Sequence, residues 1–372
     1  MKIGIVTIND NNNYGNRLQN YALQKYLLNR LKIKEVNTIW YDPQYTYISR
    51  INIFSWKTWI KYFINWKNQR NYLKKEYLKD NIRIYNIGKF TKKNSIRLDF
   101  KIKNDLSEEY NYFIVGSDQV WNPNFWSKRY NHASIRFLKF VPKEKRIAYA
   151  ASIAIPEIPK GKEQFFKDSL NEMKAISMRE KAGAELVKKL TGRDVPVVVD
   201  PTILLSKEEW QKIEMVPEWY NREKYILTYF LGNPSPIIKS IAKKNNWKIY
   251  NLMDKDNFDL YTSRVEEFIY LINHAQLVAT DSFHACVFSI LMNTPFLVVN
   301  RKEIGMADMT SRIDTLMELF GYQDRYLVND KCNLSDEEIL NMDFSNVKDI
   351  QEREKRRSKD FLEKALNLKI NN

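Results

Sequence analysis

A rare histidine lies where a strand is expected to end and a helix to begin. His284 is one of three histidines in 372 residues and follows the run Thr-Asp-Ser-Phe. Apolar residues 276–280 suit a strand, and the mostly apolar residues 285–292 suit a short helix. The helix dipole disfavours an imidazolium there, whereas a bound phosphate or carboxylate favours one. His284 is therefore either a turn-capping residue or a general acid that gains its proton beside an anion.

Cationic side chains also stand at expected strand ends. Arg179 ends the strand 175–178, where its planar fork suits a carboxylate or phosphate. The alternative for Arg179 is a structural ion pair with Glu180 or Asp200. Three further cations follow the strand 296–299 or begin the next helix: Arg301, Lys302 and Arg312. Together with His284 they outline a site for an anionic substrate.

Two polar stretches follow other expected strands. Residues 116–123 read Gly-Ser-Asp-Gln-Val-Trp-Asn-Pro, and residues 13–16 read Asn-Tyr-Gly-Asn. They are either turns or a surface that binds a sugar. In the second case, planar polar side chains would hydrogen-bond the sugar hydroxyls, and an aromatic ring would stack on the face of the sugar. The candidate sugar-binding residues are Tyr14, Asn16, Asp118, Gln119, Trp121 and Asn122.

The sequence does not predict a metal site or a hydrolase triad. His132, His274 and His284 are scattered, and Cys286 and Cys332 are far apart, so no ligand spacing exists. Ser282 lies close to His284, but no G-x-S-x-G elbow accompanies it. We expect neither a metal nor a cofactor.

The elements that position these residues alternate between strands and helices. Expected strands are 3–8, 36–40, 112–115, 146–150, 175–178, 195–199, 225–230, 247–252, 277–280 and 296–299. Expected helices include 17–31, 163–173, 180–190, 237–245, 265–273, 284–292 and 349–368. Such alternation predicts parallel α/β sheets covered by helices on both faces.

The length predicts two domains that face each other across a cleft at the carboxyl ends of their strands. We expect the first domain over residues 1–206, with an insertion at about 45–105, and a linker over 207–224. The second domain then spans 225–348. The final helix, 349–372, packs back towards the first domain.

The net charge of +15 belongs mostly to one segment. Residues 50–103 hold 15 Lys/Arg and 3 Asp/Glu, which leaves only +3 for the rest of the chain. Trp56, Trp59, Ile60 and Phe63 lie on one face of a helix by their spacing. The segment is either an accessory helical hairpin that packs on the main domain, or a patch that rests on an anionic membrane or glycan. No nucleic-acid motif accompanies the charge, so we expect no nucleic-acid partner.

The remaining composition describes a protein of the cytoplasm. The mean hydropathy is −0.53, and no apolar run is long enough to span a membrane. The first residues read as a strand, and two cysteines fit a reducing compartment. We expect a cytoplasmic protein, with a peripheral place at the inner face of the cell membrane if the basic segment binds lipid.

Five motifs, in order, resemble the polysaccharide pyruvyl transferase family. They are Asn-Tyr-Gly-Asn (13–16) with Leu-Gln-Asn-Tyr-Ala-Leu-Gln (18–24), Val-Gly-Ser-Asp-Gln-Val-Trp-Asn-Pro (115–123), Ser-Met-Arg-Glu (177–180), Asp-Pro-Thr (200–202) and Asp-Ser-Phe-His (281–284) followed by Pro295. The resemblance covers most of the chain and leaves about 45–105 unmatched. It implies a GT-B-like fold of two Rossmann-like domains with a C-terminal helix that crosses back.

The resemblance also implies a reaction. Pyruvate is transferred from phosphoenolpyruvate onto a sugar of a cell-surface polysaccharide or its lipid-linked precursor, which forms a ketal. His284 is then the acid–base residue, and Arg179 with Lys302 or Arg301 holds the phosphoenolpyruvate. Many relatives look to have the motif Arg-x-His where this chain has Ser282-Phe283-His284. The resemblance then implies that Arg301 or Arg312 takes the place of the missing arginine. The alternatives are a GT-B nucleotide-sugar glycosyltransferase and a non-catalytic glycan- or membrane-binding protein.

Overall fold

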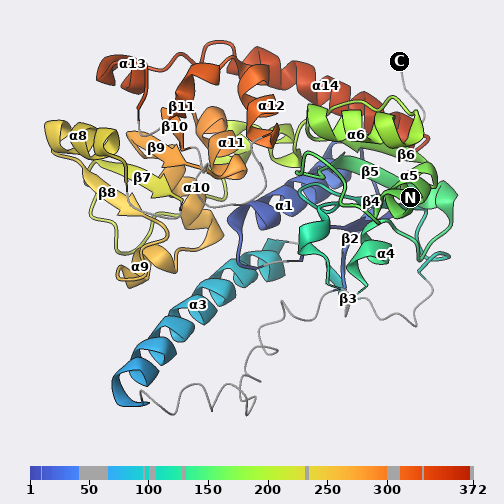
Figure 1. The fold of residues 1–372 in the computed structure, drawn as a ribbon, viewed down its shortest axis with the longest axis horizontal. Helices are drawn as coiled ribbons and strands as arrows, with labels where there is room; N and C mark the ends of the chain where they lie inside the picture. Colours follow the sequence, from blue (N-terminus) through green and yellow to red (C-terminus); the bar gives the residue numbers. More distant parts are fainter. Residues whose placement is uncertain are drawn as a thin grey trace.

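Six parallel strands form the first of two sheets (Figure 1). The computed structural model describes residues 1–9, 11–41, 66–94, 97–99, 106–127, 131–230, 234–299, 311–328 and 331–368, with the backbone alone for 66–75 and 97–99. The strands are β1 (Lys2–Val6), β2 (Glu35–Trp40), β3 (Arg97–Asp99), β4 (Tyr112–Val115), β5 (Arg146–Ala151) and β6 (Ala175–Met178). Their order β3-β2-β1-β4-β5-β6 is that of a Rossmann domain, which reverses direction between β1 and β4.

Five parallel strands form the second sheet. They are β7 (Tyr225–Tyr229), β8 (Lys248–Asn251), β9 (Leu277–Thr280), β10 (Phe296–Val299) and β11 (Tyr326–Leu327). Their order β11-β10-β9-β7-β8 is the other common order of doubly wound domains, with its reversal between β7 and β9.

Helices follow most strands and cover both faces of each sheet (Figure 1). In the first part of the chain they are α1 (Tyr14–Asn29), α3 (Trp66–Asn94), η2 (Pro123–Phe125), α4 (His132–Arg136), η3 (Lys143–Lys145), α5 (Glu163–Asn171), α6 (Lys181–Thr191), η4 (Pro201–Leu204) and α7 (Lys207–Gln211). The second part contains α8 (Pro236–Asn245), α9 (Phe258–Tyr261), α10 (Val265–Asn273), α11 (Phe283–Met292), α12 (Ser311–Phe320), η5 (Gln323–Arg325), α13 (Asp336–Leu340) and α14 (Val347–Ala365).

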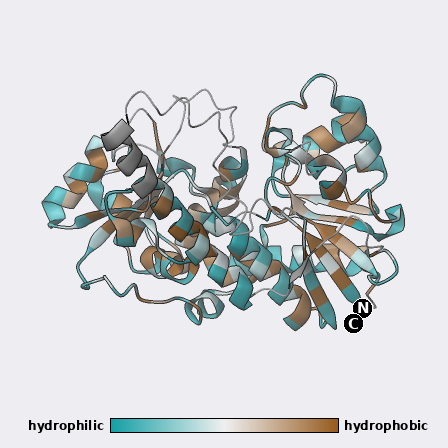
Figure 2. Ribbon diagram, turned by 90° about the horizontal axis from the view of Figure 1, so that it is seen from below, coloured by the Kyte–Doolittle hydropathy of each residue, from teal (hydrophilic) through white to brown (hydrophobic). Residues whose placement is uncertain are grey.

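One apolar core runs through the contact between the two sheet domains. It joins residues of α1 and β1 to residues of α10, α11 and α12, while separate cores lie on the outer face of each sheet. Figure 2 shows the same distribution: hydrophobic residues gather along the strands and hydrophilic ones on the outer helices. Strands buried on both faces have no polar side, as expected for parallel sheets.

The domains meet through α1, whose first residue reaches into the second domain. The ring of Tyr14 stacks on Phe268 of α10 at 4.5 Å, and its hydroxyl donates to the Ser263 carbonyl oxygen at 2.9 Å. The final helix α14 closes the other side, where the Gln351 amide donates to the carbonyl oxygens of Ile203 and Leu205 at 2.8 and 2.9 Å. These contacts hold the carboxyl ends of the two sheets towards each other.

Helix α3 contacts both domains. Its Phe90 packs against Tyr21 of α1, with ring centroids 5.4 Å apart. On the same helix the buried guanidinium of Arg83 lies 4.8 Å from the rings of both Tyr14 and Tyr261. Arg83 also donates to the Leu252 carbonyl oxygen at 3.0 Å and to that of Tyr261. The described part of the basic insertion therefore includes a structural helix across the domain contact.

The predicted fold class is confirmed: two parallel α/β sheets, a basic helical insertion in the first domain and a final crossover helix. Five elements have the bounds that the sequence predicts, namely β4, β6, β9, β10 and α10. The predicted strand 195–199 is wrong, because it makes only a bridge from Val197 to Met178. Pro196 has no N–H to donate, so the ladder beside β6 cannot extend.

Some predictions remain open because of where they fall in the chain. The aromatic residues Trp56, Trp59, Ile60 and Phe63 lie outside the described residues, so their helical face is neither confirmed nor wrong. Within the described ranges, none of the helices is both long enough and apolar enough to cross a membrane.

Replacing Arg83 with Met tests whether α3 supports the domain contact. The change leaves two buried carbonyl oxygens, those of Leu252 and Tyr261, without their charged donor, which costs about 2–3 kcal/mol. Urea unfolding should show this loss. The exposed Lys89→Met change on the same helix is the control, with little effect expected; equal stability of the two variants would contradict the role of Arg83.

Candidate active site

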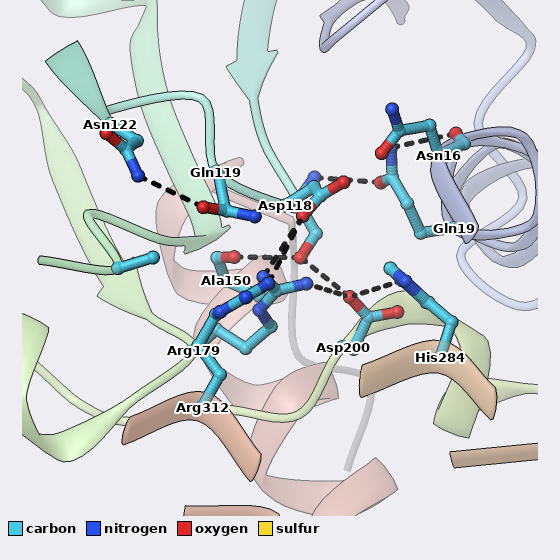
Figure 3. A network of polar contacts seen from close by, with 12 residues as sticks. Asn16, Gln19, Asp118, Gln119, Asn122, Ala150, Arg179, Asp200, His284 and Arg312 are labelled. Atoms are coloured by element: carbon cyan, nitrogen blue, oxygen red, sulfur yellow. Dashed lines mark hydrogen bonds and ion pairs between the residues drawn. The ribbon is translucent and has the colours of Figure 1, made fainter. Parts of the chain in front are cut away.

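The predicted site residues gather at the carboxyl ends of strands of both sheets. Doubly wound domains bind ligands in a crevice at these ends. From the first domain, the turn after β4 supplies Ser117 and Asp118, and the edge beside β6 supplies Arg179 and Asp200 (Figure 3). From the second domain, the start of α11 supplies His284, directly after β9.

Arg179 lies between two carboxylates. Its Nη1 donates to Asp200 Oδ2 at 2.9 Å and its Nη2 to Asp118 Oδ1 at 3.1 Å. The Arg179 side chain is only 1% exposed, and the ring of Phe283 lies 4.4 Å below the guanidinium. The alternative of an ion pair with Asp200 is therefore realised in the structure, together with a second pair that the sequence did not suggest.

Asp200 is the most connected acceptor of the cluster. The Thr202 backbone N–H and hydroxyl donate to its Oδ1 at 3.0 and 2.8 Å, and the Ser117 hydroxyl lies 2.9 Å from its Oδ2. Burial raises the pKa of the Asp200 carboxyl, but His284, Arg179 and the Thr202 N–H outweigh burial and hold it well below its usual range. Asp200 is thus a fixed, ionised carboxylate inside the protein.

The imidazole of His284 lies against this carboxylate. Its Nε2 is 3.5 Å from Asp200 Oδ2, and the residue is 5% exposed. The opposite nitrogen, Nδ1, faces the first turn of α1 at Gly15. A Cβ built on Gly15 would lie 2.0 Å from Nδ1, so no other residue at position 15 leaves room for the ring in this place.

Arg312 adds a second buried cation from α12. Its Nη1 is 4.0 Å from Asp118 Oδ1, longer than either ion pair of Arg179. Burial and the charge of Arg179 lower the pKa of Arg312 to about 10, an effect that Asp118, Glu180 and Asp200 only partly offset. Arg312 keeps its charge at neutral pH, but less favourably than an arginine in water.

A cavity of about 370 Å³ borders this cluster. Arg179, Asp200 and Arg312 form its polar end. The apolar wall consists of Val197, Val198, Val199, Ile203, Phe283, Leu316 and Leu319. Lys181, Thr315, Glu318, Glu354 and Arg357 complete the lining from α6, α12 and α14. His284 does not line the cavity, because Asp200 lies between the two.

The structure brings together four of the predicted residues: Asp118, Arg179, His284 and Arg312. Ser282 caps α11 through its hydroxyl, which accepts from the Ala285 N–H at 3.4 Å. Arg301 and Lys302 lie outside the described residues. Their predicted contact with phosphoenolpyruvate stays a prediction.

Three of the predicted sugar-binding residues are buried and contact other parts of the protein. Tyr14 and Trp121 are fully buried; Tyr14 joins the domains, and Trp121 stacks on Phe137 at 5.0 Å and donates to the Arg136 carbonyl oxygen. Asn122 is also fully buried and donates to Gln119 Oε1 at 3.0 Å. All three are buried in this structure, and their predicted contact with a sugar stays a prediction.

Two other predicted sugar-binding residues stay closer to the cluster. Asn16 is 5% exposed in the first turn of α1, next to Gly15, and its carbonyl oxygen accepts from Gln19 at 3.1 Å. Gln119 is half-buried in the turn after β4. Figure 3 shows Asn16 next to Gln19, and Gln119 between Asn122 and Asp118; the predicted contact of Asn16 and Gln119 with an acceptor stays a prediction.

Two residues that sequence reasoning did not assign to the site are central to it. Asp200 was noted only as a partner for Arg179 and in the Asp-Pro-Thr motif, although an aspartate directly after an apolar run is a signal for a strand-end site. Gly15 was read as part of a loop before a helix, and its contact with His284 joins two domains that are far apart in sequence. Among the described residues, no group of His, Cys, Asp and Glu is arranged to hold a metal ion.

Removing Arg179 should expose the cost of the two buried carboxylates. In Arg179→Met the pKa values of Asp118 and Asp200 rise because the two carboxyls stay buried without their cation. The free energy of unfolding at pH 8 should therefore be roughly 3–5 kcal/mol lower than in the wild type. Because raised carboxyl pKa values favour the folded state at low pH, the variant should regain stability from pH 8 to pH 5. Wild-type stability should not rise over that range and should fall only below about pH 4.

Chemical denaturation at the two pH values measures this difference. Lys188→Met, which breaks an exposed ion pair with Asp194, is the control and should change stability at neither pH. A variant that loses the same stability at pH 5 as at pH 8 would contradict the charge account of the cluster.

Comparison with known proteins places the chain among other proteins of similar architecture. Similar solved structures include a UDP-GlcNAc 2-epimerase from Methanocaldococcus jannaschii (14% identity, TM-score 0.44, 96% of this chain and 99% of that one). Two others are a UDP-GlcNAc 2-epimerase from Neisseria meningitidis (12%, 0.42, 96% and 100%) and MurG from Acinetobacter baumannii (9%, 0.39, 99% and 99%). At this similarity no ligand or activity is carried over.

The family comparison is more specific. No curated protein matches the chain. The sequence profile of the polysaccharide pyruvyl transferase family, in contrast, matches residues 13–303, which include Gly15, Asp118, Arg179, Asp200 and His284. Since this match covers well over half of the sequence, the chain belongs to the polysaccharide pyruvyl transferase family.

Proposed function

We propose that the protein transfers pyruvate from phosphoenolpyruvate to two hydroxyls of a surface-polysaccharide sugar, with His284 as the acid and Arg179 and Arg312 as the anion-binding residues. The observation that carries the proposal is a buried histidine beside two buried arginines that border a cavity. Phosphoenolpyruvate has a carboxylate and a phosphate, and each needs a fixed cation in a site without bulk water.

The electrostatics of Arg312 favour such a ligand. Its lowered pKa means that the cation is stabilised less in the protein than in water, because burial and Arg179 oppose its charge. An anion bound at the end of the cavity that Arg179 and Arg312 line would stabilise the Arg312 cation again. Arg179, already compensated by two carboxylates, then serves chiefly to hold Asp118 and Asp200 in place at the polar end of the cavity.

Ketal formation needs one proton at carbon. For His284 to donate it, the methylene carbon of phosphoenolpyruvate must reach past Asp200 to the imidazole ring. The proton then turns that carbon into a methyl group and leaves positive charge on the adjacent carbon. A sugar hydroxyl adds there, phosphate leaves, and a second hydroxyl adds to close the ring. The two hydroxyls release two protons, of which one restores His284 and the other leaves with phosphate.

The fixed negative charges suit this chemistry as well. In the proposed reaction, Asp200 and Asp118 would stabilise the positive charge that develops on the substrate carbon. The ionised state of both carboxylates, whose pKa values are lowered despite burial, is what this role requires.

Two variants separate binding from chemistry. His284→Asn should bind phosphoenolpyruvate but release phosphate at least about 100-fold more slowly, since general acid catalysis contributes about 100- to 10,000-fold. Leu316→Trp should fill the cavity and abolish binding of phosphoenolpyruvate. Calorimetry measures the binding of phosphoenolpyruvate. A phosphate-release assay measures turnover, with oligosaccharides from the surface polysaccharide of the producing organism as acceptors.

His274→Asn, a change at a partly exposed histidine in the second domain, is the control for His284. Full turnover by His284→Asn would end its assignment as the acid. Release of a nucleotide from a nucleotide sugar, without phosphate from phosphoenolpyruvate, would identify a glycosyltransferase instead. Glycan or vesicle binding with neither reaction would identify a non-catalytic binding protein.

We also propose that the outward face of α3 rests on an anionic membrane, where the acceptor would be made. Tyr77, Leu78 and Tyr85 are 37%, 57% and 44% exposed on this helix, and Lys89, Lys92 and Lys93 are exposed beside them. The opposite face holds Arg83 and is occupied by the two domains. An exposed mixture of aromatic, apolar and basic side chains is typical of helices that lie in a lipid interface.

Sedimentation with vesicles tests this surface. Lys89→Glu, Lys92→Glu and Lys93→Glu together should abolish binding to vesicles of phosphatidylglycerol and phosphatidylcholine, while the wild type binds these and not pure phosphatidylcholine. The control carries the same charge change at the exposed Lys239, Lys243 and Lys248 of the second domain. Equal binding by both triple variants would exclude α3 as the membrane surface.

A further inference from the structure

The guanidinium of Arg179 is held at its edge by the first domain and at its face by the second. At the edge, Nη1 donates to Asp200 and Nη2 donates to Asp118, both residues of the first domain. At the face, the ring centroid of Phe283 lies 4.4 Å from the guanidinium carbon. Phe283 is the first residue of α11, directly after the capping residue Ser282, and it is 5% exposed. The second domain therefore forms one side of the surroundings of this arginine.

The two ion pairs of Arg179 do not by themselves fix the plane of its guanidinium. Both pairs lie at the outer nitrogens, Nη1 and Nη2, so they fix only the line between these two atoms. The third nitrogen, Nε, has no hydrogen-bond partner among the described residues. The group is thus free to tilt about that line unless another group covers its face. The ring of Phe283 covers the face and restricts this tilt, because arginine stacks flat on an aromatic ring.

The ring also stabilises the charge of Arg179 without taking up a hydrogen-bond donor. The face of an aromatic ring carries partial negative charge and attracts a cation, most strongly where water is excluded. A guanidinium carries more N–H groups than the bonds to Asp118 and Asp200 use, and a third carboxylate would take up another. Phe283 takes up none, and both Arg179 and Phe283 line the cavity.

We propose that Phe283 is a positioning residue of the anion site, whose ring sets the plane of the Arg179 guanidinium from across the domain contact. The anion site of the first domain is then complete only when α11 of the second domain is in place. A ring that orders Arg179 in the free protein lowers the entropic cost of binding an anion beside it. The importance of the ring for phosphoenolpyruvate rests on the proposed function, whereas its effect on Arg179 does not.

The order of the Arg179 side chain tests this role without any ligand. The Nε–H group of an arginine gives its own nitrogen NMR signal, and Arg179→Lys, which keeps the charge, identifies the signal in question. In the wild type this N–H should be as rigid as the backbone of the sheets. In Phe283→Leu, which keeps an apolar side chain but removes the ring face, its order parameter should fall below about 0.6, the range of flexible groups.

Calorimetry measures the consequence for binding. The Kd for phosphoenolpyruvate should rise roughly 2- to 10-fold in Phe283→Leu, because the anion must then order one long side chain when it binds. Phe288→Leu is the matched control, since it makes the same change on the same helix, at a fully buried ring that packs against Trp210 with centroids 4.9 Å apart. This variant also loses buried aromatic area, but it should keep the order parameter of Arg179 and the Kd of the wild type.

An unchanged order parameter of Arg179 in Phe283→Leu would overturn the inference, whatever the Kd. Equal losses of order in Phe283→Leu and Phe288→Leu would overturn it as well, because α11 as a whole would then be responsible. An unchanged Kd despite the loss of order would overturn the part that concerns the anion. Absence of phosphoenolpyruvate binding by the wild type, together with the expected loss of order, would instead remove the proposed function and leave the positioning of Arg179 by Phe283 standing.

Discussion

The arrangement of the site depends on the burial of one guanidinium between two carboxylates. Arg179, Asp118 and Asp200 are all nearly inaccessible to water, and a buried charge is tolerated only when it is paired and hydrogen-bonded. Asp118 follows β4, Arg179 follows β6, and Asp200 precedes the short helix η4, so the pairs fix the relative positions of three loops. Once these loops are fixed, Asp200 offers an oxygen to His284 from the second domain.

The two reversal points of strand order place Asp118, after β4, and His284, after β9, at the crevice, whereas Arg179 follows the edge strand β6. In each sheet the loops that leave neighbouring strands diverge there, which opens a crevice at the carboxyl ends. Helix α1 begins on one side of that crevice and α11 on the other, and Gly15 lets the two helix starts approach closely. Helix α3, through Arg83, and helix α14, through Gln351, hold the domains in this position from the outside.

Much of this architecture was predictable because strand ends carry strong sequence signals. Arg179 directly follows an apolar run, His284 lies four residues after the end of another, and both strands have the predicted ends. The pairing of Arg179 with Asp118 and the contact of Gly15 with His284 were not predictable, since they depend on how loops and domains meet. Trp121 was assigned to a sugar because an aromatic in a polar turn resembles a binding residue; only the packing against Phe137 shows that it points inwards.

A crystal structure with phosphoenolpyruvate bound is the most direct test of the central claim, that this buried cluster is a site for that substrate. The account predicts the carboxylate and phosphate within hydrogen-bond distance of Arg179 and Arg312, and the methylene carbon within reach of the His284 ring. Phosphoenolpyruvate bound away from both arginines, or with its methylene carbon out of reach of His284, would contradict it.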